Sequence, residues 1–343
     1  MKERLLGKTP SELSEIALSC GLPAFAGKQM AQWLYQKRAG DIRQMTNLSK
    51  AGREALMEKY EVGAVAPVDV QTSRDGTRKY LFPFGEGSGI EAVMIPDEDR
   101  KTLCVSSQAG CKMNCRFCMT GRQGFHGNLS AADILNQFFA IQEAGELTNA
   151  VFMGMGEPLD NWENVKRAIE VLTAPWGLAW SPKRITLSTI GVLPKLKLFL
   201  DESRCHLAVS LHNPFPDERA QMMPVQKAWS ITEVVRLIRQ YDFTGQRRVS
   251  FEYTVFEGWN DSPRHADELL RLLKGLECRV NLIRFHKIPD FPYGTAPDRV
   301  MEAFRDRLHA GGITATIRAS RGEDIFAACG LLAGKHAENK NTP

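Results

Sequence analysis

Three cysteines close together in the chain have the spacing of an iron–sulfur ligand set. Cys111, Cys115 and Cys118 follow the pattern C-x3-C-x2-C. A cluster that serves only electron transfer is normally bound by four cysteine thiolates. Three thiolates on one short loop would bind three irons of a 4Fe–4S cluster and leave the fourth iron without a protein ligand. The amine and carboxylate of S-adenosylmethionine (SAM) are suited to chelate that open iron.

Two other uses of the cysteines deserve comparison. A structural zinc site needs four Cys or His ligands, and His126 is the available fourth ligand here. Zinc motifs usually consist of two separated pairs, however, and no second pair is present. A disulfide scaffold fits poorly, because the chain has only eight cysteines in 343 residues. We therefore favour the cluster.

Composition and charge restrict the number of domains and the class of protein only loosely. The chain is 43% hydrophobic and 24% charged, which suits one large domain or a large and a small one. Its net charge of +4 permits a nucleic-acid partner without requiring one. The N-terminus lacks the apolar core of a signal peptide, and no segment has the length of a transmembrane helix. We expect a cytoplasmic protein with reduced thiols and no membrane partner.

Residues 1–60 predict a small helical accessory domain. One helix face is marked by apolar residues spaced i, i+3, i+4 and i+7: Leu13, Ile16, Ala17 and Cys20. Cys20 is thus expected to be a core residue. A second helix should bury Met30, Trp33 and Leu34 and present the basic residues Lys28, Lys37 and Arg38. These basic side chains would contact RNA or simply form a solvated helix face.

The rest of the chain predicts an α/β fold. Residues 61–98 read as a short β linker region, with strands at 79–84 and 89–95 around a Gly-rich turn. Residues 99–334 alternate apolar runs with amphipathic helices, as a partial (βα)6-type barrel would, and 335–343 should be a frayed tail. The expected barrel strands are 103–107, 150–153, 184–189, 206–211, 249–256, 280–285 and 314–318. The expected helices include 131–143, 162–172, 231–241 and 262–273.

Polar and glycine residues follow several of these strands. In such barrels the chemistry takes place at the C-terminal strand ends, and the cysteine loop follows strand 103–107. The second strand leads into Gly154, Gly156 and Glu157, where glycines admit a ligand and a carboxylate can accept bonds from an ammonium group. The next two strands end in polar residues that could hold the hydroxyls of a nucleoside: Ser188, Thr189, Ser210 and His212.

Together with the segment Asp324–Gly330, these motifs resemble the RlmN/Cfr family of radical SAM RNA methyltransferases over nearly the whole chain. The resemblance implies one 4Fe–4S cluster on the three cysteines. It also implies SAM contacts by Gly156, Glu157, Ser188, Ser210, Leu211, His212 and His286. His286 stands where the family usually has Asn, and 188–192 looks closer to Cfr, which suggests a divergent member.

The resemblance further implies covalent catalysis at an electron-poor carbon, C2 or C8, of an adenosine. One SAM would methylate Cys329. A second SAM, cleaved reductively, would give a 5′-deoxyadenosyl radical that takes hydrogen from this S-methyl group. The resulting carbon radical would add to adenine. Cys104 would then resolve the adduct through a transient Cys104–Cys329 disulfide, with Glu91 as proton acceptor. Without the resemblance, Cys104 would read as structural and Glu91 as a surface carboxylate.

The remaining expectations concern partners and rivals. Ribosomal RNA is the first choice of substrate and tRNA the second, with the target base extruded from its stack. We expect an external electron donor of flavodoxin type and a monomeric enzyme. Cys205 and Cys278 match no family role and should be structural. The rival interpretations are a radical SAM enzyme with another substrate, such as a peptide, and a non-enzymatic iron–sulfur or zinc RNA-binding protein.

Overall fold

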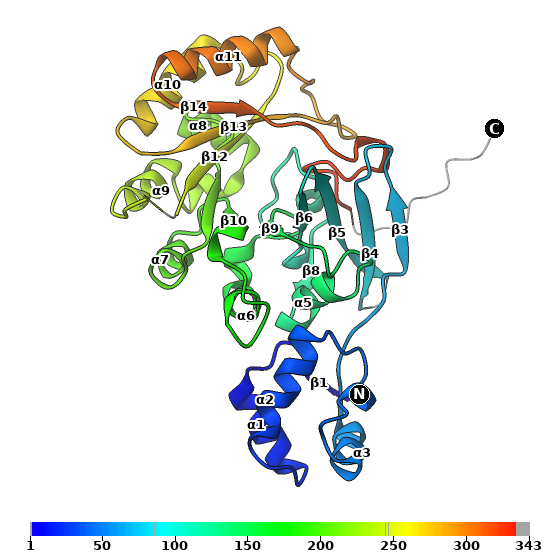
Figure 1. The fold of residues 1–343 in the computed structure, drawn as a ribbon. Helices are drawn as coiled ribbons and strands as arrows, with labels where there is room; N and C mark the ends of the chain where they lie inside the picture. Colours follow the sequence, from blue (N-terminus) through cyan, green and yellow to red (C-terminus); the bar gives the residue numbers. More distant parts are fainter. Residues whose placement is uncertain (1, 86, 244, 246, 334–343) are drawn as a thin grey trace, which may run out of the picture.

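A single curved sheet organises most of the protein. The computed structural model describes residues 2–85, 87–243, 245 and 247–333, so the expected tail at 335–343 lies outside the described residues. The sheet has ten strands in the order β14-β13-β12-β11-β10-β9-β6-β5-β4-β3 (Figure 1). Adjacent strands from β6 to β14 are parallel: β6 (Arg100–Cys104), β9 (Asn149–Phe152), β10 (Ile185–Thr189), β11 (His206–Ser210), β12 (Val249–Val255), β13 (Arg279–Arg284) and β14 (Thr314–Ile317). The expected partial βα barrel is confirmed.

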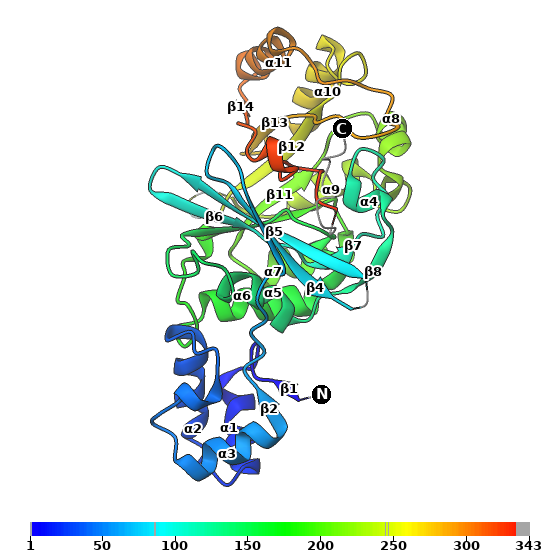
Figure 2. The ribbon, with the colours of Figure 1, turned by 90° about the vertical axis from the view of Figure 1, so that its right-hand side faces the viewer.

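Helices connect the parallel strands and cover the outer face of the sheet (Figures 1 and 2). They are α5 (Ala131–Phe139), α6 (Trp162–Thr173), α7 (Leu193–Glu202), α8 (Pro216–Met222), α9 (Ile231–Ile238), α10 (Pro263–Leu273) and α11 (Asp298–Ala310). α5 illustrates why they form: a capping box of Ser130 and Asp133 starts it, and its apolar stripe is buried. Among the described residues, no helix combines the length and apolarity needed to cross a bilayer.

The region expected as a β linker extends the sheet. β3 (Asp69–Thr72), β4 (Arg78–Phe84) and β5 (Ser88–Asp97) form an antiparallel meander, and β5 pairs with β6. In that register Val93 on β5 lies opposite Cys104. The meander therefore extends the sheet beyond β6, and residues 69–97 belong to the same sheet as the parallel strands.

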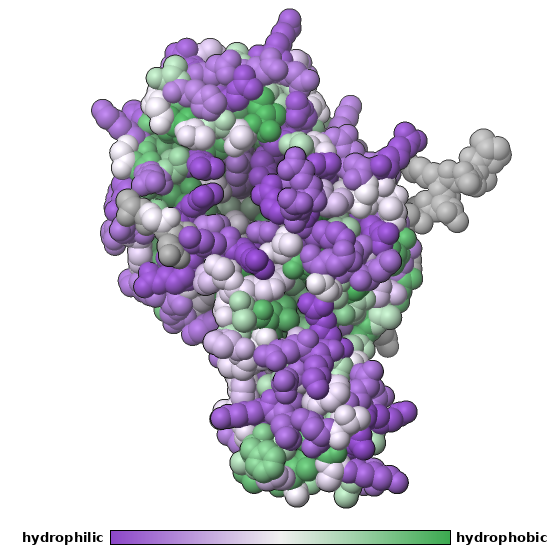
Figure 3. Space-filling view, in the orientation of Figure 1, coloured by the Kyte–Doolittle hydropathy of each residue, from purple (hydrophilic) through white to green (hydrophobic). Residues whose placement is uncertain are grey.

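The N-terminal lobe is mainly helical and projects from the barrel (Figure 1). It contains α1 (Pro10–Ser19), α2 (Ala26–Ala31), a π-helical turn η1 (Gln32–Gln36), a 3-10 turn η2 (Ile42–Gln44), α3 (Lys50–Lys59) and the parallel pair of β1 (Glu3–Arg4) with β2 (Tyr60–Glu61). The predicted apolar faces are buried at Leu13, Ile16, Ala17, Met30 and Leu34, whereas Cys20 and Trp33 are only half-buried against the core. Lys28 and Lys37 are exposed as expected, whereas Arg38 is half-buried. Figure 3 shows apolar surface at the far end of this lobe, where Leu18 and Phe25 are exposed.

The cysteine loop lies between two short strands beyond β6. The predicted strand 103–107 extends past the observed one, because β6 ends at Cys104. The chain then forms β7 (Gln108–Gly110), α4 (Met119–Arg122) and β8 (Phe125–Asn128), with β7 and β8 antiparallel. Asn161, which ends the 3-10 turn η3 (Pro158–Asn161), donates to the carbonyls of Ser107 at 2.8 Å and Leu129 at 2.7 Å. One buried amide thus fixes both ends of the β7–β8 hairpin.

This buried amide gives a stability prediction. Asn161→Ala removes both hydrogen bonds and leaves buried carbonyls without their donor, so the free energy of unfolding should fall by about 2–3 kcal/mol. Urea unfolding followed by circular dichroism measures the change. A loss below about 1 kcal/mol would show that water replaces the amide and that the hairpin is held by other contacts.

Candidate active site

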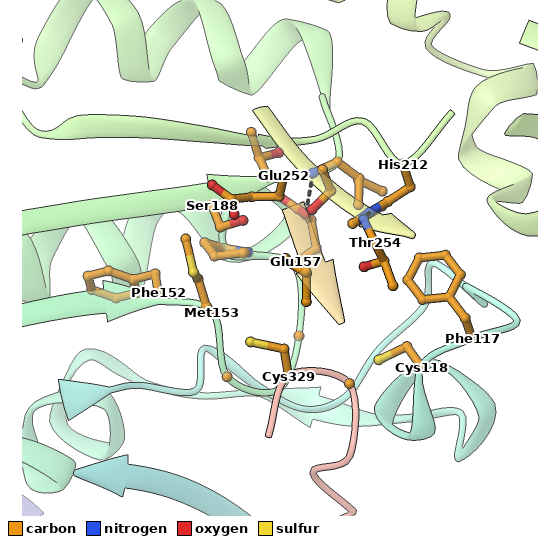
Figure 4. A pocket seen from close by; sticks show the side chains of 18 of the residues that line it. Phe117, Cys118, Phe152, Met153, Glu157, Ser188, His212, Glu252, Thr254 and Cys329 are labelled. Atoms are coloured by element: carbon orange, nitrogen blue, oxygen red, sulfur yellow. Dashed lines mark hydrogen bonds between the residues drawn. The ribbon is translucent and has the colours of Figure 1, made fainter. Parts of the chain in front are cut away.

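A cavity of about 160 Å³ opens at the C-terminal ends of the parallel strands (Figure 4). Cys118 and Cys329 lie on one side of it, and Glu157, Ser188, Glu252 and His212 lie on the opposite side. The lining residues come from the cysteine loop, the ends of β9 to β13 and the C-terminal segment: Phe117, Cys118, Phe152, Met153, Gly154, Gly156, Glu157, Pro158, Ser188, Thr189, Ile190, Ser210, His212, Glu252, Thr254, Ile283, Arg284, Phe285, Cys329 and Gly330.

The cysteine loop is held in place through its backbone. The Cys111 amide donates to the Gly124 carbonyl at 2.8 Å, and the Met119 amide donates to the Gly330 carbonyl at 2.8 Å. Cys115 is buried, whereas Cys111 and Cys118 are half-buried. The second of these hydrogen bonds joins the end of the cysteine loop directly to the segment that carries Cys329.

The three thiols suit a cluster better than a zinc ion. Burial raises the pKa of Cys111 to about 12 and also raises the pKa of Cys115 and of Cys118, so metal loading must displace protons. Within the described part of the chain, no three His, Cys, Asp or Glu side chains converge closely enough for one metal ion, and His126 is exposed. A 4Fe–4S cluster provides a separate iron for each thiolate, so its ligands need not meet at one point. The donor set fits a cluster with one open iron.

Glycines let the loop after β9 pack against the chain that leaves β6. A Cβ on Gly154 would lie 2.8 Å from the Val105 carbonyl carbon, and one on Gly156 would lie 2.5 Å from the Cβ of Gln108. Gly156 also has a φ of +97°, which disfavours any L side chain. The sequence suggested that these glycines admit a ligand. The structure shows that close packing of two backbones also requires them.

Glu157 is a buried carboxylate with several donors. It accepts from the Leu159 amide at 3.1 Å and from the Ile190 amide at 3.0 Å. Burial raises its pKa to about 7, although hydrogen bonds from Thr189, Ile190 and Leu159 oppose this shift. The carboxylate therefore lies in the cavity wall with its position set by the ends of β9 and β10.

His212 presents a hydrogen-bond donor to the cavity. Its Nδ1 accepts from the Thr254 amide at 3.0 Å, so the neutral ring carries its proton on Nε2. Burial and the charge of Arg219 lower its pKa to about 3, which keeps the ring neutral at physiological pH. Its edge meets the ring of Phe117 at a centroid distance of 5.0 Å. Leu211, by contrast, has its side chain in the core and does not line the cavity.

Cys329 and Cys104 lie on neighbouring segments near the cavity. Cys329 is exposed and lines the cavity, after a 3-10 turn (Glu323–Ile325) whose Asp324 accepts from the Ser73 hydroxyl at 2.5 Å. Cys104 is buried at the end of β6. Burial raises the pKa of the Cys104 thiol, and the charge of Cys329 adds to this shift, so the two thiols lie within electrostatic reach.

Glu91 and His286 are predicted site residues that do not line the cavity, as is also true of Cys104, Cys111, Cys115 and Leu211. Glu91 is buried, pairs with Lys79 Nζ at 3.0 Å and accepts from the Ala333 amide at 2.6 Å, so it contacts the segment that follows Cys329. His286 Nε2 lies 3.1 Å from the Ser320 hydroxyl, on the segment that precedes Cys329. A role of either residue in proton transfer or in SAM contact stays a prediction.

Several residues that line the cavity or support it were not predicted from the sequence. Glu252 and Thr254 lie on β12 and line the cavity. A charged residue inside an apolar strand was the available signal for Glu252. Arg219 is fully buried and donates to the carbonyls of Ser210 and Leu211, both at 3.0 Å. No sequence motif predicted this buried position. Cys205 and Cys278 lie outside the cavity lining.

The buried Glu157 predicts a pH-dependent stability in the metal-free protein. The folded carboxyl keeps its proton up to about pH 7, whereas a solvent-exposed glutamate in the unfolded chain loses it near its ordinary pKa of 4.5. Stability should therefore fall as the pH rises between these values. Relative to Glu157→Gln, which does not titrate, the wild type should lose roughly 3 kcal/mol from about pH 4.5 to 7.5. Urea unfolding of both proteins across this range measures it. If the difference in unfolding free energy between the two proteins did not change with pH, the pKa of Glu157 would not be raised in the folded protein.

Two family descriptions match the chain. "Radical SAM superfamily" matches residues 105–273, which contain the cysteine loop and the strands from β9 to β12. "Ribosomal RNA large subunit methyltransferase N-terminal domain" matches residues 4–62, the helical lobe. The first match lies within the sheet and its helices, and the second covers the helical lobe; residues 63–104 and 274–343 lie outside both.

Relatives match over nearly the full length. A probable dual-specificity RNA methyltransferase RlmN of Porphyromonas gingivalis is 61% identical over 98% of both chains. That of Parabacteroides distasonis is 59% identical over 97% of both, and the dual-specificity RNA methyltransferase RlmN of Syntrophus aciditrophicus is 42% identical over 96% of both. The crystal structure of a radical SAM methyltransferase from Sphaerobacter thermophilus superposes with a TM-score of 0.92 at 39% identity, covering 97% of this chain and 100% of that one. The chain therefore belongs to the RlmN family of the radical SAM superfamily.

Proposed function

We propose that this protein is a radical SAM methyltransferase that adds a methyl group to C2 or C8 of an adenosine in RNA. The observation that carries the proposal is the shared cavity of Cys118 and Cys329. In this cavity Cys118, a proposed cluster ligand, and the accessible thiol of Cys329 both face the polar residues at the ends of the parallel strands. This arrangement suits a reaction in which a cysteine is first methylated and then activated by a radical.

The comparisons support an RNA substrate. The relatives are named as RNA methyltransferases with dual specificity, and the match to the N-terminal lobe names large-subunit ribosomal RNA. We infer that ribosomal RNA and tRNA are the two substrate classes. The rival peptide-modifying and non-enzymatic interpretations are not favoured by these comparisons. The named relatives are RlmN proteins, so the comparisons also give no support to the Cfr-like interpretation of residues 188–192.

Each cavity residue has a task in this proposal. Cys111, Cys115 and Cys118 would hold the 4Fe–4S cluster, which supplies the electron for reductive cleavage of SAM. Glu157 would accept from the SAM ammonium group, and His212 would donate from Nε2. The SAM contacts proposed for Gly156, Ser188, Ser210, Leu211 and His286 complete the set, although the Leu211 and His286 side chains do not line the cavity.

Cys329, Cys104 and Glu91 would carry out the covalent steps. The exposed Cys329 would take the methyl group and, after loss of one hydrogen atom, attach its carbon to adenine. The radical adduct would lose one electron together with the ring proton, and the cluster that Cys111, Cys115 and Cys118 would hold could accept the electron. Cys104 would then attack the Cys329 sulfur, forming a disulfide and releasing the base, whose CH2 group would take up a proton to become the methyl group. Glu91 would accept the ring proton. Glu91 accepts a hydrogen bond from the Ala333 amide, so it lies beside the segment that carries Cys329.

The remaining partners follow from the chemistry. The proposed cluster needs an external one-electron donor, for which a flavodoxin-type protein is suited. We propose that the enzyme acts as a monomer in the cytoplasm, where its RNA substrates are found. The exposed lysines of the N-terminal lobe, Lys28 and Lys37, would contribute RNA contacts.

The function is tested by anaerobic reconstitution. The protein is loaded with iron and sulfide and supplied with reductant, methyl-labelled SAM, and ribosomal RNA or tRNA that lacks the modification. Digested RNA is then analysed by mass spectrometry. We expect labelled methyladenosine from the wild type and none from Cys329→Ala. The matched control Cys278→Ala changes a thiol outside the cavity and should retain activity. Equal methylation by Cys329→Ala would refute the mechanism.

A second prediction separates the two catalytic thiols. Cys104→Ala should still acquire a methyl group on Cys329, because that step needs only one thiol. It should fail to release its product and accumulate a covalent protein–RNA adduct, visible as a slow band on a denaturing gel. Absence of the adduct together with full turnover would show that another group resolves it.

A further inference from the structure

Phe326 is a large apolar residue at the surface, close in the chain to the proposed catalytic thiol. It is 63% exposed and lies three residues before Cys329, which is also exposed. Ala327 and Ala328, between the two, are buried. A single exposed apolar residue is common on protein surfaces and needs no function. Phe326 differs from such a residue in its backbone conformation and in its position.

The backbone of Phe326 has an unfavourable conformation. Its φ of +52° and ψ of +38° lie in the left-handed region, where a bulky L residue is strained. Glycine and asparagine adopt this region at a lower cost. An aromatic side chain here therefore costs stability in the turn. Backbone strain of this kind is concentrated at functional sites.

The turn that carries Phe326 is anchored on its inner side (the short red coil in Figure 2). Asp324 accepts from the Ser73 hydroxyl at 2.5 Å, and the Gly322 amide donates to Asp75 at 3.0 Å. The two residues that flank Phe326 pack into a small apolar cluster. The turn is thus fixed to the loop before β4, and the ring of Phe326 stays at the surface.

The chemistry of Cys329 determines what can lie beside Phe326. In the proposed reaction, one carbon atom joins the Cys329 sulfur to a ring carbon of the target adenosine. Three residues span no more than about 11 Å, so Phe326 lies within one or two nucleotides of that base. The target base has to leave its stack to reach the cavity, and its neighbour then loses a stacking partner. An aromatic ring can replace that partner.

The charges around the turn are balanced. Residues 318–324 carry two arginines, Arg318 and Arg321, and two carboxylates, Glu323 and Asp324. Such a segment has no net charge to attract the phosphate backbone, so the ring of Phe326 is the group here that suits RNA. A contact made by the ring should depend little on salt, because stacking releases no counterions.

We propose that Phe326 stacks on an RNA base that flanks the target adenosine and so replaces the stacking that is lost when the adenosine enters the cavity. The inference rests on the proposed function, because that function brings RNA to Cys329. Phe326 touches none of the reacting atoms in this proposal. It holds the flanking nucleotide and thereby positions the target base.

Kinetics on the cluster-loaded protein test the proposal. The probe is the RNA that the wild type methylates, either unmodified ribosomal RNA or unmodified tRNA. Phe326→Ala should lower kcat/KM for this RNA roughly 5- to 100-fold, as expected for the loss of one base–aromatic stack. Phe326→Tyr and Phe326→Trp should stay within about threefold of the wild type, whereas Phe326→Leu, apolar without a ring, should resemble Phe326→Ala. The loss should be equal at low and high salt.

Photochemical crosslinking tests the position of the contact. Phe326 is replaced by the photoreactive residue p-benzoylphenylalanine, and the protein is irradiated with the same RNA. We expect a crosslink at a nucleotide adjacent to the methylated adenosine, mapped by reverse transcription. The matched control places the same residue at Leu198, which is exposed on α7, and should give no crosslink there.

Stability separates a contact with RNA from a structural role. Phe326→Asn relieves the backbone strain, so the urea midpoint of the cluster-loaded protein should stay the same or rise while kcat/KM falls as in Phe326→Ala. A lower midpoint would show that the ring supports the fold and would overturn the proposal. Wild-type kcat/KM in Phe326→Ala, or a crosslink far from the target, would also overturn it. Failure of the proposed function is distinguishable, because the wild type would then methylate neither RNA.

Discussion

The site depends on the close approach of two backbone segments, residues 105–108 after β6 and 153–157 after β9. The amides of Ser107 and Gln108 both donate to the Met155 carbonyl, at 2.9 and 3.1 Å, and the Gly154 amide donates to Val105. Gln108 in turn accepts from the Glu157 amide at 2.9 Å. There is no room for a Cβ at Gly154 or Gly156, so a side chain at either position would push the cysteine loop away from Glu157. The packing of residues 105–108 against 153–157 therefore sets the distance between the three cysteines and the ends of the parallel strands.

The cavity is lined by buried ionisable side chains whose burial costs free energy on folding. Burial raises the pKa of Glu157 and of Glu252 and lowers that of His212, so each charged form is disfavoured. Each oxygen of Glu157 accepts one backbone amide, and the two donors to Glu252 both reach its Oε1. A carboxylate oxygen can accept more than one hydrogen bond, so a ligand that donates hydrogen bonds in the cavity would add to these contacts. Ligand binding should therefore stabilise the strand ends that form the cavity.

Much of this arrangement could be predicted from local sequence. The spacing of the three cysteines, the alternation of strands and helices, and the polar residues at strand ends are short-range patterns. Glu252, Arg219 and the Lys79–Glu91 pair were not predicted to be buried partners, because their contacts depend on how individual side chains pack in three dimensions and not on a repeating sequence pattern. The membership of the meander at 69–97 in the same sheet as the parallel strands was not predicted either: β5 and β6 form a hairpin with a two-residue turn, Glu98 and Asp99, which the sequence patterns did not reveal.

The segment around Cys329 combines firm anchoring with exposure. On one side the Gly330 and Leu332 carbonyls accept from the Met119 amide and the Thr120 hydroxyl, each at 2.8 Å, and on the other the Ala333 amide donates to Glu91. Ala327 and Ala328 are buried, whereas Cys329 is exposed. Two of these three contacts reach the cysteine loop, so any shift of that loop also moves the thiol. The Cys329 thiol can thus be reached from the cavity while its position relative to the cysteine loop is held by the fold.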